Sequence, residues 1–325
     1  MDLSTKFLGI KIRNPIIVGS SGLSNSLDGI KKLEDNNAGA VILKSLFEEQ
    51  IINEGKTIVD KNVYEHPDAY DYIKNYTKQN SVEKYLNLIE KAKDAIDIPV
   101  IASINCVSSE EWIDFADQIE KVGADGLELN VSFLPSADNV TGNENEKLYF
   151  DITEKLRSVI NIPIALKMSY YSSGLANLIK RLSWTGFIDS FILFNRYYNP
   201  DINIDKIEIV PSNVLSNPED ISVSLRWIAL LSRIIETDLV PSTGIHDANG
   251  VIKQILAGAG SVQIVSTLYK NGAEYINNII QELSEWMKSH EFASIDDFKG
   301  KIHDLMPENN MFERVQYMKY YGGIS

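Results

Sequence analysis

Eight short apolar runs, rich in β-branched residues, alternate along the chain with segments of helical periodicity. The runs lie at 16–18, 40–43, 100–104, 126–129, 164–168, 191–194, 239–240 and 262–265. Their hydrophobicity is continuous rather than alternating, which is typical of parallel strands buried on both faces. Between them, apolar residues recur every three or four positions, as Leu86, Ile89 and Ala92 do, and this spacing predicts amphipathic helices. The pattern therefore indicates an α/β protein with a parallel sheet.

A closed TIM (β/α)8 barrel and an open, doubly wound sheet are both built from such units. The count of eight strands favours the barrel, as does the absence of a Gly-x-Gly-x-x-Gly turn after the first strand. With 325 residues, 44% of them hydrophobic, the chain suits a single barrel domain over residues 1–325. Segments 46–81 and 197–224 exceed ordinary βα loops, so we expect them to cover the barrel mouth. Residues 300–325 are interpreted as a C-terminal tail.

Charge and composition narrow the partners and the compartment. The formal net charge of −14, from 45 acidic and 31 basic side chains, would repel nucleic acid. The single cysteine, Cys106, allows no intrachain disulfide and fits a reducing compartment. The N-terminus does not resemble a signal peptide, and no apolar run approaches the roughly 20 residues of a membrane span. We therefore expect a cytoplasmic protein without a membrane partner, and no histidine spacing suggests a metal site.

The candidate site is read from the carboxyl ends of the strands, where barrels of this kind place their chemistry. Small residues, hydroxyls, amides and lysines occur there, and no carboxylate ends a strand: Gly19, Ser20, Ser21, Lys44, Ser45, Asn105, Asn130, Lys167, Asn195, Thr243, Gly244, Ser266 and Thr267. The last four suit a phosphate, which binds backbone N–H groups and a helix N-terminus. Lys167 lies within its strand, and because an unpaired buried ammonium is costly, a role in the site is favoured. His246 is expected to cap the helix that follows, with contact to a phosphate as the alternative.

These residues together resemble the dihydroorotate dehydrogenase family of FMN-dependent flavoproteins over residues 3–305. The string Leu-Glu-Leu-Asn-x-Ser at 127–132 is the most specific match, and the others are 14–21, 44–45, 165–167 and 258–263. The resemblance implies FMN as cofactor, bound by the strand-end residues above, with catalytic roles for Lys44, Asn130 and Lys167. It also implies a pyrimidine-like substrate, dihydroorotate, whose hydride passes to flavin N5. A homodimer is the expected assembly.

The substrate side departs from the family pattern. In the family, the catalytic base stands directly before a proline in the continuation of this string. Here the sequence runs Ser132-Phe133-Leu134-Pro135, so Phe133, which cannot accept a proton, occupies the base position. Ser132 lies one residue too early and, by strand alternation, points away from the substrate, which makes it a doubtful base. A shifted alignment offers Ser136 instead.

Three alternatives to dihydroorotate oxidation therefore stay open. The first is an FMN oxidoreductase with another substrate, in which Arg196 binds a carboxylate. The second is a flavin-binding protein without dehydrogenase turnover. The third is a flavin-free, aldolase-like barrel in which Lys167 forms a Schiff base.

Overall fold

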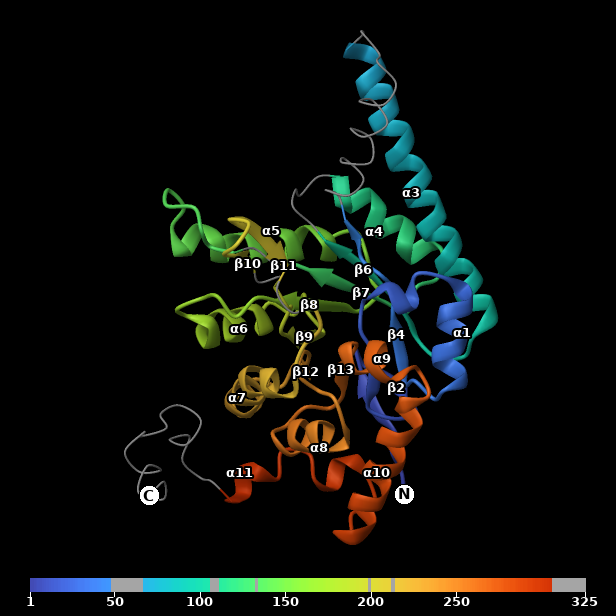
Figure 1. Ribbon diagram of the computed structural model, residues 1–325, viewed down its shortest axis with the longest axis vertical. Coiled ribbons are helices and arrows are strands. Elements are labelled where there is room, and N and C mark those ends of the chain that lie inside the picture. Colours follow the sequence, from blue (N-terminus) through green and yellow to red (C-terminus); the bar gives the residue numbers. More distant parts are fainter. Residues whose placement is uncertain (48–66, 106–110, 132–133, 198–199, 212–213, 306–325) are drawn as a thin grey trace.

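The computed structural model describes residues 1–47, 67–105, 111–131, 134–197, 200–211 and 214–305. Parallel strands occupy the centre of the molecule and helices surround them (Figure 1). The eight central strands are β3 (Ile16–Val18), β4 (Ala40–Ile42), β6 (Val100–Asn105), β7 (Gly126–Asn130), β8 (Ile164–Met168), β9 (Ser190–Leu193), β12 (Asp238–Pro241) and β13 (Val262–Ile264). Each matches one of the eight predicted apolar runs to within one or two residues.

The strand order establishes a barrel rather than an open sheet. Neighbours run β12-β9-β8-β7-β6-β4-β3-β13, all parallel. The two end strands then meet through a parallel bridge between Ser242 and Gln263, which nearly closes the ring. The predicted TIM barrel is confirmed, and the doubly wound alternative is wrong.

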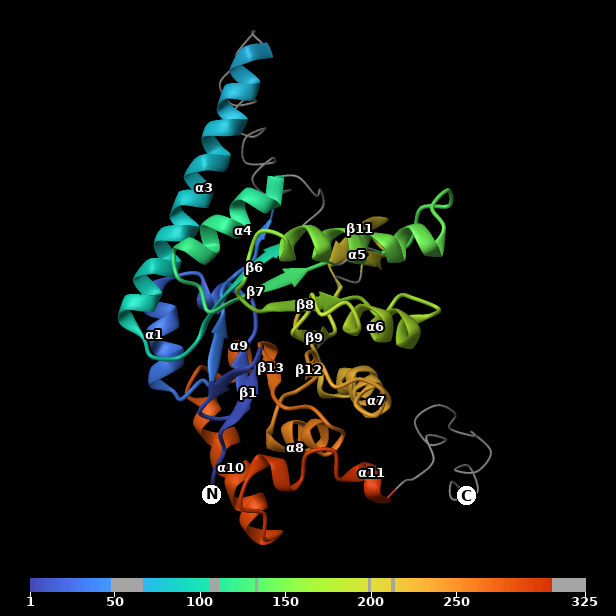
Figure 2. The ribbon, with the colours of Figure 1, turned by 180° about the vertical axis from the view of Figure 1, so that it is seen from behind.

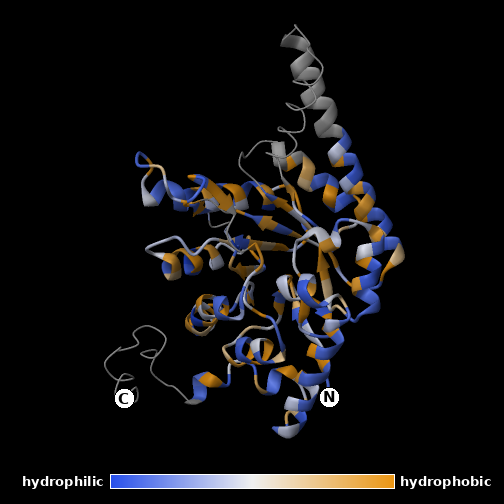
Figure 3. Ribbon diagram, in the orientation of Figure 1, coloured by the Kyte–Doolittle hydropathy of each residue, from blue (hydrophilic) through white to orange (hydrophobic). Residues whose placement is uncertain are grey.

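Helices form the outer layer, as the view from behind also shows (Figure 2). They are α1 (Leu27–Asp35), α3 (Pro67–Ala95), α4 (Glu111–Lys121), α5 (Gly142–Arg157), α6 (Leu175–Ser183), α7 (Ile221–Leu231), α8 (Ala248–Leu256), α9 (Ser266–Asn271), α10 (Tyr275–Ser289) and α11 (Ile302–Leu305). Side-chain caps start several of them: Ser26, Thr141 and Asp247 accept backbone N–H groups of the first turns of α1, α5 and α8. Figure 3 shows hydrophobic strands at the centre and mixed colouring on the helices, as amphipathic helices around a core require.

The amino-terminal end of the barrel is filled by a hairpin that the sequence did not predict. Strands β1 (Thr5–Phe7) and β2 (Ile10–Ile12) pair antiparallel. Phe7, Leu8 and Ile12 are buried against the inward-facing side chains of the central strands. A Cβ on Gly126, the first residue of β7, would lie 2.9 Å from Leu8 Cδ1. The hairpin therefore plugs this end, and the opposite end is the mouth.

The two long excursions contain regular structure. Segment 46–81 begins with β5 (Leu46–Phe47) and ends inside α3, which extends well beyond the barrel in Figure 1. Segment 197–224 contains an antiparallel hairpin of β10 (Pro200–Asn203) and β11 (Glu208–Pro211). Among the described residues, no helix is both long enough and apolar enough to cross a membrane.

Candidate active site

A layer of polar side chains lies inside the barrel, directly above the apolar plug. Ile101 and Ala165 belong to the apolar layer, and strand alternation places Ser103 and Lys167, two residues further on, on the same inward face. The Lys167 side chain is 9% exposed. Lys167, which its position within a strand made a candidate for the site, is thus nearly buried in this layer.

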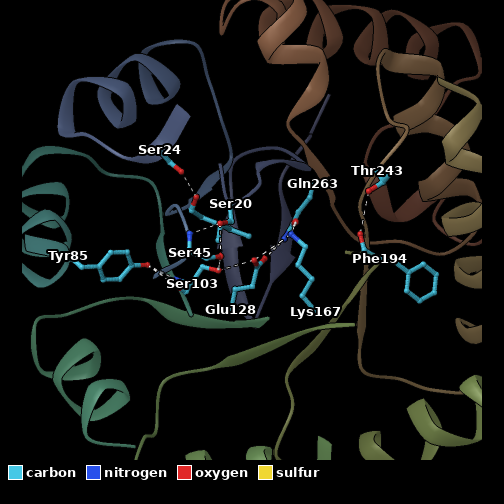
Figure 4. A network of polar contacts seen from close by, with 11 residues as sticks. Ser20, Ser24, Ser45, Tyr85, Ser103, Glu128, Lys167, Phe194, Thr243 and Gln263 are labelled. Atoms are coloured by element: carbon cyan, nitrogen blue, oxygen red, sulfur yellow. Dashed lines mark hydrogen bonds and ion pairs between the residues drawn. The ribbon is translucent and has the colours of Figure 1, made fainter. Parts of the chain in front are cut away.

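Lys167 has two polar partners on other strands. Its Nζ donates to Gln263 Oε1 of β13 at 3.2 Å and lies 3.5 Å from Glu128 Oε1 of β7. Gln263 Nε2 in turn donates to Glu128 Oε2 at 2.9 Å. The three side chains form a closed, buried ring in the barrel interior (Figure 4). The Glu128 carboxylate lies a layer below the strand ends. Neither Glu128 nor Gln263 was predicted from the sequence as a partner of Lys167.

A row of hydroxyl groups connects this ring to the barrel mouth (Figure 4). Ser103 Oγ donates to Glu128 Oε1 at 3.1 Å and lies 2.7 Å from Ser45 Oγ, which lies 2.9 Å from Ser20 Oγ. The Tyr85 hydroxyl supports Ser103 from outside the barrel, since it accepts from the Ser103 N–H at 2.7 Å and donates to the Ser103 carbonyl at 3.1 Å. Burial raises the pKa of the Tyr85 phenol, so it stays a neutral donor.

A cavity of about 260 Å³ opens at the carboxyl ends of the strands. It is lined by Ser20, Lys167, Asn195, Arg196, Val214, Leu215, Ser216, Ser242, Thr243, Gly244, Ile245, Gln263, Ile264, Val265, Ser266 and Tyr269. Six residues predicted from the strand ends are therefore brought together here: Ser20, Lys167, Asn195, Thr243, Gly244 and Ser266. The site combines two cations, Lys167 and Arg196, with amides, hydroxyls and small residues, which suits a ligand that carries an anionic group and a polar heterocycle.

The turn after β12 takes a conformation that demands a small residue. Gly244 has φ +79°, and a Cβ there would lie 2.1 Å from the Ile221 nitrogen, so only glycine fits. Thr243 also has a positive φ of 78°, a strained value for a β-branched residue. Strain of this kind clusters at ligand-binding turns. That this turn binds a phosphate stays a prediction.

A hydrogen-bonded loop lies beside the start of α9. The Ser216 N–H donates to Ser266 Oγ at 3.0 Å, and Ser216 Oγ lies 3.0 Å from His246 Nε2. Burial, and then the nearby Lys270 ammonium, lower the pKa of His246. Thr267 is fully buried and donates to the His246 carbonyl, so its hydroxyl has a structural partner. His246 was predicted to cap α8; this was wrong, because Asp247 is the cap and His246 bonds to Ser216 instead.

The remaining predicted residues are not among those that line the cavity. Asn105, Asn130 and Lys167 are register neighbours on β6, β7 and β8. Asn130 is 6% exposed, and its Oδ1 has no hydrogen-bond partner within the described part of the chain. Lys44, after β4, is exposed, and Ser21 caps the 3-10 turn η1 (Gly22–Ser24).

Gly19 lies next to Gln263, because a Cβ on Gly19 would be 3.1 Å from Gln263 Oε1. Ser45 is buried within the hydroxyl row. Ser132 and Phe133, on which the prediction of a lost base depends, lie outside the described residues.

A second cavity, of about 200 Å³, adjoins the first. Asn195, Arg196, Ser242 and Thr243 line both, while the second adds Tyr170, Phe194, Tyr197, Glu219, Asp220, Ser222, Val223 and Ser224. Aromatic rings pack along its edge, with the Tyr170 centroid 5.7 Å from that of Phe194. Arg196 is engaged there: its Nε lies 3.9 Å from Asp220 Oδ2 and its Nη1 donates to the Val214 carbonyl.

The donor set of the first cavity, together with Asn130, the register neighbour of Lys167 on β7, fits FMN. A buried lysine can balance the charge of a reduced isoalloxazine, and the unpaired carbonyl of Asn130 can accept from the N–H of a pyrimidine edge. The turn at Thr243–Gly244 and the start of α9 offer backbone N–H groups for a phosphate. No cluster of three or more histidine, cysteine or acidic side chains that could hold a metal exists among the residues described.

Fold and site define a class: a (β/α)8-barrel protein with a lysine- and amide-lined site at the carboxyl ends of its strands. Residues 2–287 match the family model described as "Dihydroorotate dehydrogenase", and the chain belongs to this family of FMN-dependent oxidoreductases. The family predicted from the Leu-Glu-Leu-Asn-x-Ser string is thereby confirmed.

The chain is similar to three relatives, each named "Dihydroorotate dehydrogenase B (NAD(+)), catalytic subunit". It is 27% identical to that of Thermoplasma acidophilum over 312 residues, 92% of this chain and 98% of the relative. The protein of Pyrococcus horikoshii is 26% identical over 92% of this chain and 97% of its own. That of Methanocaldococcus jannaschii is 24% identical over 93% and 98%.

Proposed function

We propose that this chain binds FMN at the barrel mouth and oxidises dihydroorotate, or a closely related dihydropyrimidine, as the names of its relatives suggest. One observation carries the proposal: Lys167 is held inside the barrel by Glu128 and Gln263 and lines a donor-rich cavity. A cation fixed beside a heterocycle stabilises negative charge that develops during reduction.

FMN, when bound, supplies the hydride acceptor. Lys167 would orient the ring and hold its charge, while Asn105, Asn130 and Lys44 would bind its polar edge. The turn at Thr243–Gly244 and the start of α9 would hold the phosphate. Exclusion of water by the buried layer below strengthens each of these contacts.

The proton-accepting group of the reaction separates two candidate functions. We infer from the family resemblance that Phe133 occupies the base position, and along the sequence the adjacent hydroxyl residues are Ser132 and Ser136. An unactivated serine is a poor base at neutral pH. This favours, as a second candidate, a flavin-binding protein without dihydroorotate turnover.

The experiment is an anaerobic titration of the purified protein, followed by its visible spectrum. We expect stoichiometric FMN absorbance that bleaches on addition of dihydroorotate. An oxidised spectrum that dihydroorotate leaves unchanged, but dithionite bleaches, would overturn the substrate assignment. In that case bleaching by another carboxylate-bearing reductant would indicate a different substrate, with Arg196 as the residue to test, and no bleaching by any such compound would indicate a binding role.

The Schiff-base alternative for Lys167 is less well supported. The Glu128 carboxylate pairs with the protonated amine, which is not the form that attacks a carbonyl. Borohydride trapping of a carbonyl compound on Lys167, in protein free of flavin, would establish that alternative instead.

We also propose that the chain forms a homodimer through the hairpin of β10 and β11. Four isoleucines, Ile202, Ile204, Ile207 and Ile209, are 64–88% exposed on it. Ile202 and Ile209 are register partners, so they share one face of the hairpin. An exposed apolar face of this kind marks an interaction surface, and a two-fold axis lets a hairpin cover itself with its own copy.

A further inference from the structure

Glu128 is a buried carboxylate that serves the site without touching it. Its side chain is fully buried, and it is absent from the lining of the main cavity. Both of its oxygens are used: Oε1 accepts from Ser103 and faces Lys167, while Oε2 accepts from Gln263. Two of these three partners, Lys167 and Gln263, line the cavity. Glu128 therefore lies directly behind the wall that a ligand meets.

The chemistry of the ring fixes the orientation of Gln263. A carboxylate can only accept hydrogen bonds and an ammonium can only donate them, so the amide must turn its NH2 to Glu128 and its carbonyl to Lys167. Gln263 thereby accepts from the Lys167 ammonium, and Glu128 Oε1 lies 3.5 Å from the same nitrogen. An ammonium carries three donors, and the two described partners use at most two of them. The carboxylate thus determines where the lysine charge is held.

The same carboxylate determines how much positive charge the cavity experiences. The ring of Glu128, Lys167 and Gln263 sums to zero formal charge, although its member at the cavity is a cation. Because the pair is buried, solvent screens it weakly, so the carboxylate offsets much of the lysine's field. Without it, the cavity would face an uncompensated ammonium.

We propose that Glu128 is a positioning residue that holds Lys167 in place and sets the reduction potential of bound FMN by compensating its charge. The inference rests on the proposed function, because it requires FMN beside Lys167. Glu128 would thus act on the reduction potential of the flavin without contacting substrate or cofactor. The expected sign follows directly: the carboxylate disfavours the anionic reduced flavin and keeps the potential low.

The central test is Glu128→Gln, a change that keeps shape and removes charge. Because the ammonium is then uncompensated, we expect the affinity for reduced FMN relative to oxidised FMN to rise at least tenfold, which raises the midpoint potential by about 30 mV for a two-electron couple. The measurement is a spectroelectrochemical titration with reference dyes, together with the dissociation constant of oxidised FMN from fluorescence quenching. A purely structural role would weaken binding of both redox forms without this upward shift.

Ser103→Ala is the matched control. It removes the hydrogen bond to Glu128 Oε1 but leaves every charge in place, and the Tyr85 contacts, which use the Ser103 backbone, remain. We expect loss of thermal stability with an unchanged potential. An equal upward shift in Ser103→Ala would mean that packing, not charge, controls the potential, and would overturn the inference.

A second pair of variants keeps the test decisive if Glu128→Gln does not fold. Lys167→Met leaves the carboxylate uncompensated and should lower the potential. The double variant with Glu128→Gln removes both charges and should raise the potential again. At pH 8 we expect its affinity for reduced FMN relative to oxidised FMN to be at least tenfold higher than in Lys167→Met. Equal potentials in the single and double variants would overturn this inference but leave the proposed function standing. Wild-type protein that binds no FMN would overturn the proposed function and this inference with it.

Discussion

At the scale of single residues, the barrel interior tolerates a lysine and a glutamate because each neutralises the other. Glu128 is fully buried and Lys167 nearly so, and each would be costly to bury alone. A buried ion pair adds little net stability, whereas removal of one partner leaves the other charge unpaired. The pair is therefore better explained by what the cavity requires of the lysine than by stability.

His246 gives a pH dependence that can be measured on FMN-free protein. Its pKa is lowered by burial first and then by Lys270, with Asp247 acting in the opposite direction. As pH falls through about 6.5, the unfolded chain takes up a proton before the folded chain does, so stability is lost on acidification. His303, whose pKa is also lowered, first by burial and then by Arg233, contributes in the same direction.

We expect the urea midpoint of the wild-type protein to fall between pH 7.5 and pH 5.5, and to fall less in His246→Gln. The glutamine keeps a donor and an acceptor for Ser216 but cannot titrate. The same loss in both proteins would show that His246 does not contribute.

How far the sequence predicts the site depends on whether the signal is local. Lys167 was identified because a lysine in an apolar strand is unusual, and the same reasoning applied to Glu128, in the run Leu127-Glu128-Leu129, would have identified its partner. Gln263 could not be assigned in this way, since it meets Glu128 across 135 positions of sequence only because the barrel closes. Pairings of that kind depend on register and closure, which no local pattern encodes.

At the scale of elements, the sequence predicted the strands that are buried on both faces and missed the strands of the two hairpins, which are not. All eight central strands were found from continuous apolar runs. The hairpins β1–β2 and β10–β11 have short strands with alternating polarity, as in Thr5-Lys6-Phe7 and Asp201-Ile202-Asn203, and such patterns are weak signals at three or four residues. The sequence likewise did not predict that α3 begins at Pro67, because this residue lies within a polar stretch.

The hairpin at the closed end of the barrel should matter for stability far more than its length suggests. Phe7 is fully buried among inward-facing residues from the central strands, including Ile17 and Ile101. Phe7→Ala would leave a cavity that the surrounding strands cannot close, and we expect a loss of about 3–5 kcal/mol in the free energy of unfolding. The measurement is urea denaturation followed by far-UV circular dichroism.

Lys11→Ala is the control for this hairpin, since Lys11 is exposed on β2. We expect it to change stability by less than about 0.5 kcal/mol. If Phe7→Ala changed stability as little, the hairpin would not be needed to stabilise the closed end of the barrel.

At the scale of the whole molecule, net charge opposes dimer formation and the exposed isoleucines of β10–β11 favour it. A net charge of −14 drives two copies apart, while the isoleucine face of β10–β11 draws apolar surfaces together. Burying an isoleucine fully contributes about 1.5–3 kcal/mol relative to leaving it exposed. Four such side chains on each copy can therefore outweigh a repulsion that acts at long range and is screened by salt.

The proposed dimer should consequently tighten, not weaken, as salt increases. We expect sedimentation velocity to give a lower dimer dissociation constant at 500 mM than at 50 mM NaCl, because the Debye length shrinks while apolar burial persists. Ile202→Ser with Ile209→Ser should raise that constant at least tenfold, whereas Ile234→Ser, at an exposed isoleucine outside the hairpin, should leave it unchanged. A dimer that dissociates with salt would be held by charge and would lie on another face. A monomer at every concentration would overturn the proposed dimer.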